Sequence, residues 1–198
     1  PMKMQREEIK NLVMYQTGAL KAYLEEFKLP LNHIKPHGSL YGVSAKEEDV
    51  AHGIADAAEI FGVGIFGMVN TFHEKVYKER GIKFIAEFYS DLEYDETGYL
   101  VIAKGRNKYY PADLAVERCM RAIKENKVKT VNNTDIDVGC ETICVHSDTP
   151  NAIEILQALR KNMSQNNPTK ELKDITDKKM PYIAVSYTHL RAHETFGY

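Results

Sequence analysis

The chain has 198 residues, of which 43% are hydrophobic and 27% are charged, and its formal net charge is -2. A chain of this length and apolar content predicts one globular domain with a substantial core. Because domains that bind nucleic acid usually present a basic face, the slightly acidic balance excludes nucleic acid as the expected partner.

The sequence indicates neither a membrane span nor a disulfide framework. Its longest apolar stretch, residues 60–69, is far shorter than the ~20 residues that a helix needs to cross a bilayer. The three cysteines, Cys119, Cys140 and Cys144, form an odd number without a C-x-x-C pair. That argues against both disulfide bonds and a structural zinc site. We therefore expect a cytoplasmic protein with no membrane partner.

The first elements are a helix, a short strand and a second helix. Residues 9–27 carry apolar side chains at helical spacing and predict a helix that Pro30 ends. The extended-prone residues 31–36 predict a short strand. Ser44 and Glu47 have the spacing of a capping box, which predicts that the second helix begins there.

The middle of the chain predicts two buried strands around a third helix. Residues 63–69 are almost continuously apolar, as is typical of a strand buried on both faces. Thr71 and Glu74 again have capping-box spacing and predict the next helix. Residues 82–88 then repeat the strand pattern.

The last part begins with a long excursion over residues 91–110, after which Pro111 predicts the start of a helix. Residues 127–131 and 142–146 predict two further strands, and Thr149-Pro150 predicts the start of the last helix. Strands and helices thus alternate along the chain. That alternation predicts an α/β fold with a parallel sheet.

Ionisable residues follow two of these strands. Lys35 and His37 come after the first strand, and His146 and Asp148 come at the end of the last one. In α/β proteins the carboxyl ends of parallel strands carry the active site, so we expect chemistry there. The alternative is structural: a lysine extending to solvent, a histidine bonded to its own turn, and Asp148 or Thr149 capping a helix.

A third strand end carries two carboxylates, Glu87 and Asp91, which would suit an acid/base pair. The alternative is a surface loop that is simply rich in acidic residues. Cys144 and His146 lie on one face of a strand with period two, which keeps a Cys/His nucleophile pair open. A plain buried thiol is the alternative reading of Cys144.

Four segments in order resemble motifs of the LamB/YcsF family. They are Tyr15-Gln16-Thr17-Gly18-Ala19-Leu20 for Y-Q-x-G-A-L, Lys35-Pro36-His37-Gly38-Ser39-Leu40-Tyr41 for K-P-H-G-A-L-Y, Glu87-Phe88-Tyr89-Ser90-Asp91-Leu92-Glu93-Tyr94 for E-x-F-A-D-R-x-Y, and Cys144-Val145-His146-Ser147-Asp148-Thr149-Pro150 for a C-V-H-G-D-T-P segment. Two departures stand out, because Leu92 replaces the arginine and Ser147 replaces the glycine.

The resemblance implies a distorted seven-stranded β/α barrel, related to sugar deacetylases. We expect residues 1–163 to form one α/β domain, a partial barrel of the glycoside hydrolase/deacetylase type that lacks its first strands. Pro1-Met2 resembles the last two positions of a family segment G-F-G-R-R-x-M, so we expect the front of the domain to be missing. Residues 164–198 are expected to be a polar, poorly ordered tail, and residues 186–195 resemble a translated sequencing-adapter artefact.

The resemblance also implies an activity, that of the A subunit in an ATP-dependent 5-oxoprolinase. Such an enzyme opens the lactam of 5-oxoproline to L-glutamate with ATP and Mg²⁺, together with partner subunits B and C. The chain has no G-x-x-x-x-G-K-[ST] phosphate loop, so we expect ATP to bind at a site of another type or in a partner subunit.

The residues matched by these motifs receive roles as expectations. We expect Lys35 to stabilise the negative charge that develops during the reaction. We expect His37 or His146 to transfer a proton and Asp91 or Asp148 to orient that histidine. The residues assigned to substrate binding are Gly38, Tyr41, Glu87 and Thr149.

Two other readings remain open. The first is a metal-dependent hydrolase of C-N bonds, in which His37 and His146 are among the ligands of a divalent ion. The second is a catalytically silent relative that binds a small molecule, which the departures at Leu92 and Ser147 would fit.

Overall fold

The computed structural model describes residues 3–102, 108–165 and 182–186. The chain forms two compact units, Pro1–Glu87 and Phe88–Tyr198, and the boundary falls within a strand. Most of the expected tail lies outside the described residues, including 187–195 of the segment that resembles an artefact. The expectation of a single domain over residues 1–163 stays a prediction.

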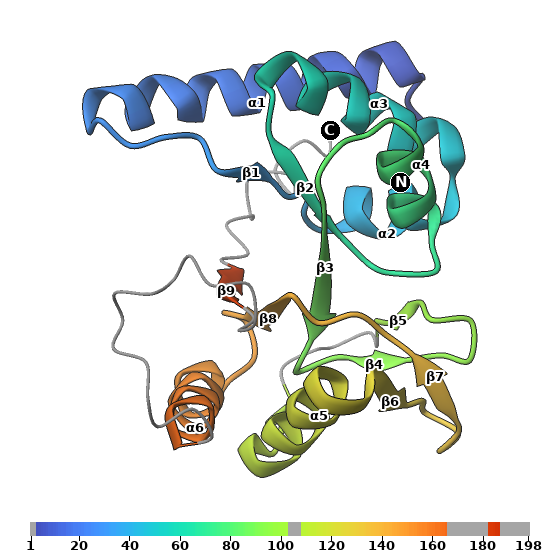
Figure 1. The fold of residues 1–198 in the computed structure, drawn as a ribbon, viewed down its shortest axis with the longest axis vertical. Coiled ribbons are helices and arrows are strands. Elements are labelled where there is room, and N and C mark those ends of the chain that lie inside the picture. The colour runs from blue at the N-terminus through green and yellow to red at the C-terminus, as the bar shows by residue number, and fades with distance from the viewer. Residues whose placement is uncertain (1–2, 103–107, 166–181, 187–198) are drawn as a thin grey trace, which may run out of the picture. The chain divides into compact units, whose positions relative to one another are not determined.

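The first unit packs helices around short parallel strands (Figure 1). Its elements are α1 (Arg6–Glu26), β1 (His33–Ile34), α2 (Ser39–Lys46), α3 (Glu48–Phe61), β2 (Gly64–Gly67), α4 (Phe72–Glu79) and the first part of β3 (Phe84–Tyr89). β1 pairs with β2 and β2 with β3, both in parallel. The helices and strands expected over this part are therefore present.

The core of the first unit depends on close contact between α1 and α3. Ile9 and Val13 of α1 are buried with the alanine-rich face of α3. Gly53 permits this approach, because a Cβ there would lie 2.8 Å from the backbone oxygen of Arg6. Arg6 also donates two hydrogen bonds of 2.7 Å to the Asp56 carboxylate, which lowers the pKa of Asp56 to about 2.

The capping box expected at Ser44 and Glu47 is wrong. Ser44 lies inside α2, and its hydroxyl donates to the carbonyl of Tyr41 over 3.0 Å. Glu47 precedes α3 but makes no side-chain cap. The spacing arose from two adjoining helices, which local pattern does not separate. At Thr71 the expected cap is present, since its Oγ1 accepts from the backbone N–H of His73 at 3.2 Å.

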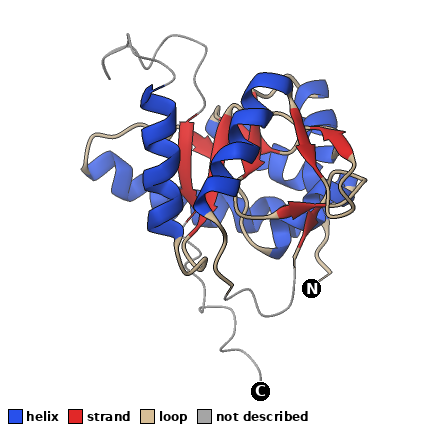
Figure 2. Ribbon diagram, turned by 90° about the horizontal axis from the view of Figure 1, so that it is seen from below, coloured by secondary structure: helices blue, strands red, loops and turns tan. Residues whose placement is uncertain are grey.

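The second unit adds two helices and the remaining strands. Its elements are the end of β3, β4 (Glu93–Tyr94), β5 (Leu100–Val101), α5 (Ala112–Glu125), β6 (Lys127–Lys129), β7 (Asp135–Asp137), β8 (Thr142–His146), α6 (Ala152–Gln165) and β9 (Tyr182–Ser186). β8 is buried along its whole length. Figure 2 distinguishes these helices and strands by colour.

The expected alternation of parallel strands and helices is interrupted by two antiparallel hairpins. The excursion after Asp91 contains the pair β4–β5, which closes through a turn in which Gly98 has φ +83. The strand expected at 127–131 is β6, but it pairs antiparallel with β7 in a separate two-stranded sheet. Short hairpins carry little periodic signal, because each strand has only two or three residues.

The main sheet has the order β1-β2-β3-β8-β9, and β8 pairs with β9 in parallel. The α/β class with parallel pairing is therefore confirmed. The last helix begins at Ala152, two residues beyond the expected start at Thr149-Pro150. None of the helices in the described part of the chain combines the length and apolarity that crossing a membrane requires.

Candidate active site

The first cluster is a buried ion pair in the first unit. Lys35 follows β1, and its Nζ donates to Oε1 of Glu87 near the end of β3 over 2.5 Å. The two side chains are 8% and 0% exposed. Burial strengthens the attraction between opposite charges. If either charge is removed, the other stays buried without a partner, which is strongly unfavourable. Lys35 is thus a fixed cation that Glu87 holds in place.

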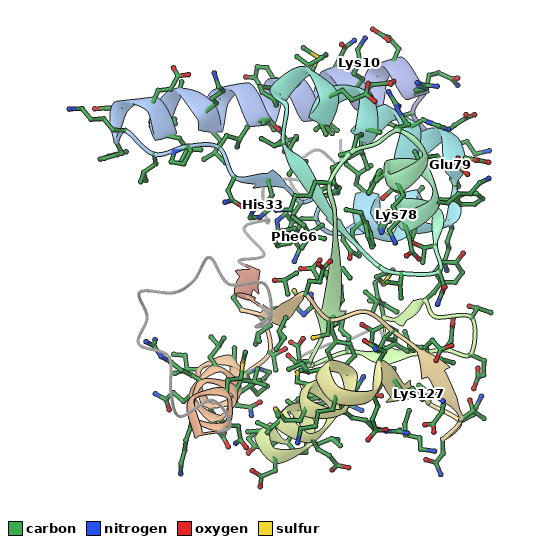
Figure 3. The ribbon with its side chains drawn as sticks, in the orientation of Figure 1. Lys10, His33, Phe66, Lys78, Glu79 and Lys127 are labelled. Atoms are coloured by element: carbon green, nitrogen blue, oxygen red, sulfur yellow. The ribbon has the colours of Figure 1, made fainter. Side chains whose placement is uncertain are left out.

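A stacked histidine lies on β1, two residues before Lys35. His33 of β1 lies against Phe66 of β2 (Figure 3). Their ring centroids are 3.8 Å apart, and their planes are 5° from parallel. Burial lowers the pKa of His33, and the positive charge of Lys35 lowers it further. His33 is therefore biased towards its neutral form.

The turn after Lys35 presents its motif residues in different directions. His37 and Gly38 are exposed, whereas Tyr41 is only 3% exposed and packs edge-on against His73. Gly38 precedes α2 with φ +60, a conformation that side chains disfavour. Substrate binding by Gly38 and Tyr41 stays a prediction.

His73 is a buried polar residue that the sequence patterns did not single out. Its Nδ1 accepts from the backbone N–H of Met68 at 3.2 Å, and its Nε2 lies 2.8 Å from Oγ of Ser44. Because Ser44 donates its own proton to the carbonyl of Tyr41, Nε2 of His73 must be the donor in that contact. Burial lowers the pKa of His73 to about 3, so the ring is neutral.

The second cluster joins Asp91, His146 and Thr149 in the second unit. Oδ1 of Asp91 lies 2.8 Å from Nδ1 of His146. Its other oxygen, Oδ2, accepts from the backbone N–H of His146 at 3.0 Å and from the Thr149 hydroxyl at 2.6 Å. The side chains of Asp91 and His146 are 0% and 9% exposed. Two strand ends, after β3 and at β8, therefore meet in one hydrogen-bonded group.

The electrostatics of this group fix the histidine tautomer. Burial raises the pKa of Asp91, but the hydrogen bonds from His146 and Thr149 outweigh burial, so the pKa is lowered overall. An ionised Asp91 can only accept, so Nδ1 of His146 must carry the proton. In the neutral ring Nε2 then holds the lone pair, which is the arrangement of a general base oriented by a carboxylate.

Two neighbours complete the surroundings of the His146 ring. Tyr89 stacks on it with centroids 5.4 Å apart. Sγ of Cys144 lies 3.9 Å from Nε2, on the same face of β8 as the period-two pattern predicted. Cys144 is completely buried, so its contact with Nε2 fits a packed thiol better than a nucleophile open to substrate.

The segment after β8 separates its three motif residues. Ser147 and Asp148 are exposed, whereas Thr149 is buried and gives its hydroxyl to Asp91 instead of capping α6. The residues with positive φ in the described part do not include Ser147, so the serine that replaces glycine causes no backbone strain there.

Arg118 of α5 is a further residue that sequence reasoning missed. It is buried and donates to the backbone carbonyl of Leu92, next to Asp91. Leu92 is itself a core residue, 6% exposed. A charged residue on the buried face of α5, between Ala115 and Ala122, was the signal that would have found Arg118.

The described residues contain no group of three or more histidine, cysteine, aspartate or glutamate side chains placed to hold a metal ion. Within that part of the chain, the structure therefore adds no third ligand to either His37 or His146. The divalent ion stays a prediction.

Comparison with known proteins gives a consistent result. The model of the LamB/YcsF family matches residues 1–177. A lactam utilization protein lamB of Emericella nidulans is 36% identical over 171 residues, which are 84% of this chain and 66% of that protein. The A subunit of the 5-oxoprolinase of Oceanobacillus iheyensis is 36% identical over 162 residues, which are 80% and 63% of the two chains.

A solved structure shares the fold as well. The crystal structure of a lactam utilization protein from Thermus thermophilus matches with a TM-score of 0.74 and 29% sequence identity. The match covers 83% of this chain and 67% of that one. The chain thus spans about two thirds of the length of the relatives it matches.

Proposed function

We propose that this chain, which belongs to the LamB/YcsF family, is part of the A subunit of a 5-oxoprolinase. The reaction is the ATP-dependent hydrolytic opening of the 5-oxoproline lactam to L-glutamate. The names of the relatives support this proposal, and so does the Asp91–His146 pair at the carboxyl ends of β3 and β8. The observation that carries it is this pair, because hydrolysis of an amide needs a base for water.

The proposal also includes a closed barrel as the fold of the whole domain. We expect the parallel strands described above to be part of a seven-stranded β/α barrel of the deacetylase type. In such a barrel the carboxyl ends of the strands face one site. The ends of β3 and β8 already carry the orienting carboxylate and the base of the proposed reaction.

The chemistry explains why a nucleotide is needed. The lactam of 5-oxoproline is an unstrained amide and a poor electrophile, and ATP with Mg²⁺ supplies phosphoryl activation of its oxygen. No residue of this chain is assigned to the nucleotide, since the sequence lacks the phosphate-loop motif. Subunits B and C are the proposed partners, and the cytoplasm, where ATP is abundant, is the proposed compartment.

The chain's own residues have the following proposed roles. Nε2 of His146 takes a proton from the attacking water, and Asp91 keeps the ring in the required tautomer. Lys35, held by Glu87, stabilises negative charge on the substrate. His37 and Asp148, both exposed, are proposed to act in proton transfer and orientation as substrate arrives.

The test is 5-oxoproline-dependent formation of glutamate with ATP, using the complete gene product together with subunits B and C. His146→Asn is expected to lower the rate about 10²- to 10⁴-fold, the usual contribution of general acid–base catalysis. The matched control is His52→Asn on α3, a histidine outside the cluster, which is expected to keep activity. A folded, fully assembled wild-type complex that forms no glutamate would overturn the proposal.

A further inference from the structure

The residues behind the Asp91–His146 pair form a continuous chain of contacts centred on Arg118. This side chain is 7% exposed. One terminal nitrogen donates to the carbonyl oxygen of Leu92 over 2.6 Å, and the other donates to Oε1 of Glu93 over 2.8 Å and to the Tyr110 hydroxyl. Arg118 therefore binds the two residues that directly follow Asp91.

Tyr110 continues the chain of contacts towards α6. Its hydroxyl donates to Glu93 over 2.9 Å, so the same oxygen is an acceptor for Arg118. Its backbone N–H donates to Asn151 Oδ1 at 3.0 Å, and its carbonyl accepts from Asn151 Nδ2 at 2.8 Å. Burial raises the pKa of the Tyr110 phenol, which keeps the donor proton in place.

The contacts close into a ring around the catalytic pair. Asn151 follows Thr149 by two residues, and Thr149 donates its hydroxyl to Asp91. The path from Asp91 thus runs through Leu92, Arg118, Tyr110, Asn151 and Thr149 and returns to Asp91. Arg118 is the single cation in that ring and makes two of its contacts, with Leu92 and Tyr110, and a third contact outside it, with Glu93.

We propose that Arg118 is a positioning residue, which keeps the Asp91 carboxylate in register with Nδ1 of His146. The segment that carries Asp91 and Leu92 is anchored by a planar guanidinium that donates from two separate nitrogens, whereas an ammonium donates from one nitrogen only. The Asp91–His146 distance of 2.8 Å allows little drift, since hydrogen bonds between these atoms fail beyond about 3.2 Å. Displacement of a catalytic group by about 1 Å costs on the order of 10²-fold in rate.

The effect of Arg118 on turnover rests on the proposed function, but its effect on the Asp91–His146 hydrogen bond does not. A direct readout of that bond is the proton on Nδ1 of His146, which gives a downfield resonance in the proton NMR spectrum. The resonance is assigned by its absence in His146→Asn. Spectra of the full chain are compared for the wild type, Arg118→Lys and Arg121→Lys.

Arg121 provides a matched control on the same helix. It lies one turn further along α5, is more exposed, and pairs with Glu125 and Asp135 at the surface. Arg118→Lys is expected to shift or broaden the His146 resonance, whereas Arg121→Lys leaves it unchanged. In the assembled complex, Arg118→Lys is expected to lower kcat about 10²-fold with little change in KM.

A second variant covers the case in which Arg118→Lys does not fold. Tyr110→Phe keeps the ring and its packing but removes the hydroxyl that links Arg118 with Glu93. It is expected to produce a smaller shift of the same resonance. An unchanged resonance in either folded variant would overturn the proposal. If the resonance responds but the wild-type complex makes no glutamate, the oxoprolinase proposal fails and the positioning role stands.

Discussion

Among the residues that the structure describes, each unit buries one histidine, and the two differ in what they face. His73 in the first unit lies among Ser44, the backbone N–H of Met68 and the ring of Tyr77. His146 in the second unit faces the carboxylate of Asp91. Both are buried, yet of the two only His146 faces an anion that can stabilise positive charge on its ring.

This difference separates a structural histidine, His73, from the histidine that we propose to be catalytic, His146. Burial without an anion makes protonation of His73 costly, so that ring serves as a fixed donor and acceptor. A buried carboxylate beside His146 offsets the cost of charge during a reaction. Burial alone therefore does not identify a catalytic histidine, and the partner of Nδ1 is the more informative observation.

The largest expected effect comes from removing the carboxylate that distinguishes the two histidines. Asp91→Asn is expected to lower the rate of glutamate formation by about 10²- to 10⁴-fold, because an amide does not hold the His146 tautomer. The rate is measured in the assembled complex. Asp137→Asn on β7 changes an exposed carboxylate and is expected to keep the rate. Full activity of Asp91→Asn would remove the contrast between His73 and His146.

A second change tests whether the first unit also depends on a buried charge. Glu87→Gln removes the carboxylate charge that Lys35 faces and is expected to lower the free energy of unfolding by about 3 kcal/mol. Urea denaturation measures this free energy. Glu48→Gln breaks an ion pair with Lys75 whose side chains are 41% and 50% exposed, and it is expected to cost less than about 1 kcal/mol. Equal losses in the two variants would contradict a special role for burial.

The third prediction concerns the contribution of His73 to the pH dependence of the free energy of unfolding. Its pKa in the folded protein is about 3, below the ordinary value of 6.5, so the unfolded chain binds a proton that the folded chain does not. Stability is therefore fully present above pH 6.5 and falls as the pH drops towards 3, by at most about 1.4 kcal/mol per pH unit.

His73→Gln keeps a donor and an acceptor but does not titrate. Between pH 4.5 and 6, in a window above the lowered pKa of Asp91, its free energy of unfolding is expected to depend less on pH than that of the wild type. Denaturant titrations at several pH values measure both slopes. Identical slopes would mean that His73 is protonated in the folded protein.

The smallest effect is expected at the turn after His146. Ser147→Gly restores the glycine of the motif, but Ser147 has no positive φ to relieve. We expect a loss of less than about 1 kcal/mol, which arises from the greater freedom of the unfolded chain. Thermal unfolding measures it. In Gly38→Ala the combination of φ +60 and ψ -136 is one that alanine hardly adopts, and a larger cost of about 1–3 kcal/mol is expected. A gain in stability from Ser147→Gly would show hidden strain.

The sequence predicted the elements that bury apolar faces, because their periodicity is local. β8 was expected over residues 142–146 and is found there, and α1 and α4 follow their patterns closely. Ser44 was misread, since its spacing to Glu47 is that of a cap while its actual partners are a carbonyl in the same helix and a ring 29 residues away. Tertiary contacts of this kind leave no local signature.

The site was predicted in outline for a similar reason. Placing Asp91 and His146 at strand ends followed from the rule for parallel sheets, and the structure brings the two side chains within 2.8 Å of each other, while their catalytic roles stay a prediction. Arg118 was not predicted, because a single cation in an amphipathic helix is typical of the surface, although its place in the helical repeat lies between the buried Ala115 and Ala122. Only the fold shows that its helix turns that position towards Leu92.

The contact between α1 and α3 has a consequence for sequence variation. At Gly53 even a methyl group would come within 2.8 Å of the Arg6 backbone and 3.0 Å of Ile9. At Gly42, in α2, an added methyl group would meet nothing within 4 Å. In a library with every residue allowed at both positions, selection for folding would return almost only glycine at 53, while 42 would tolerate alanine and other small side chains.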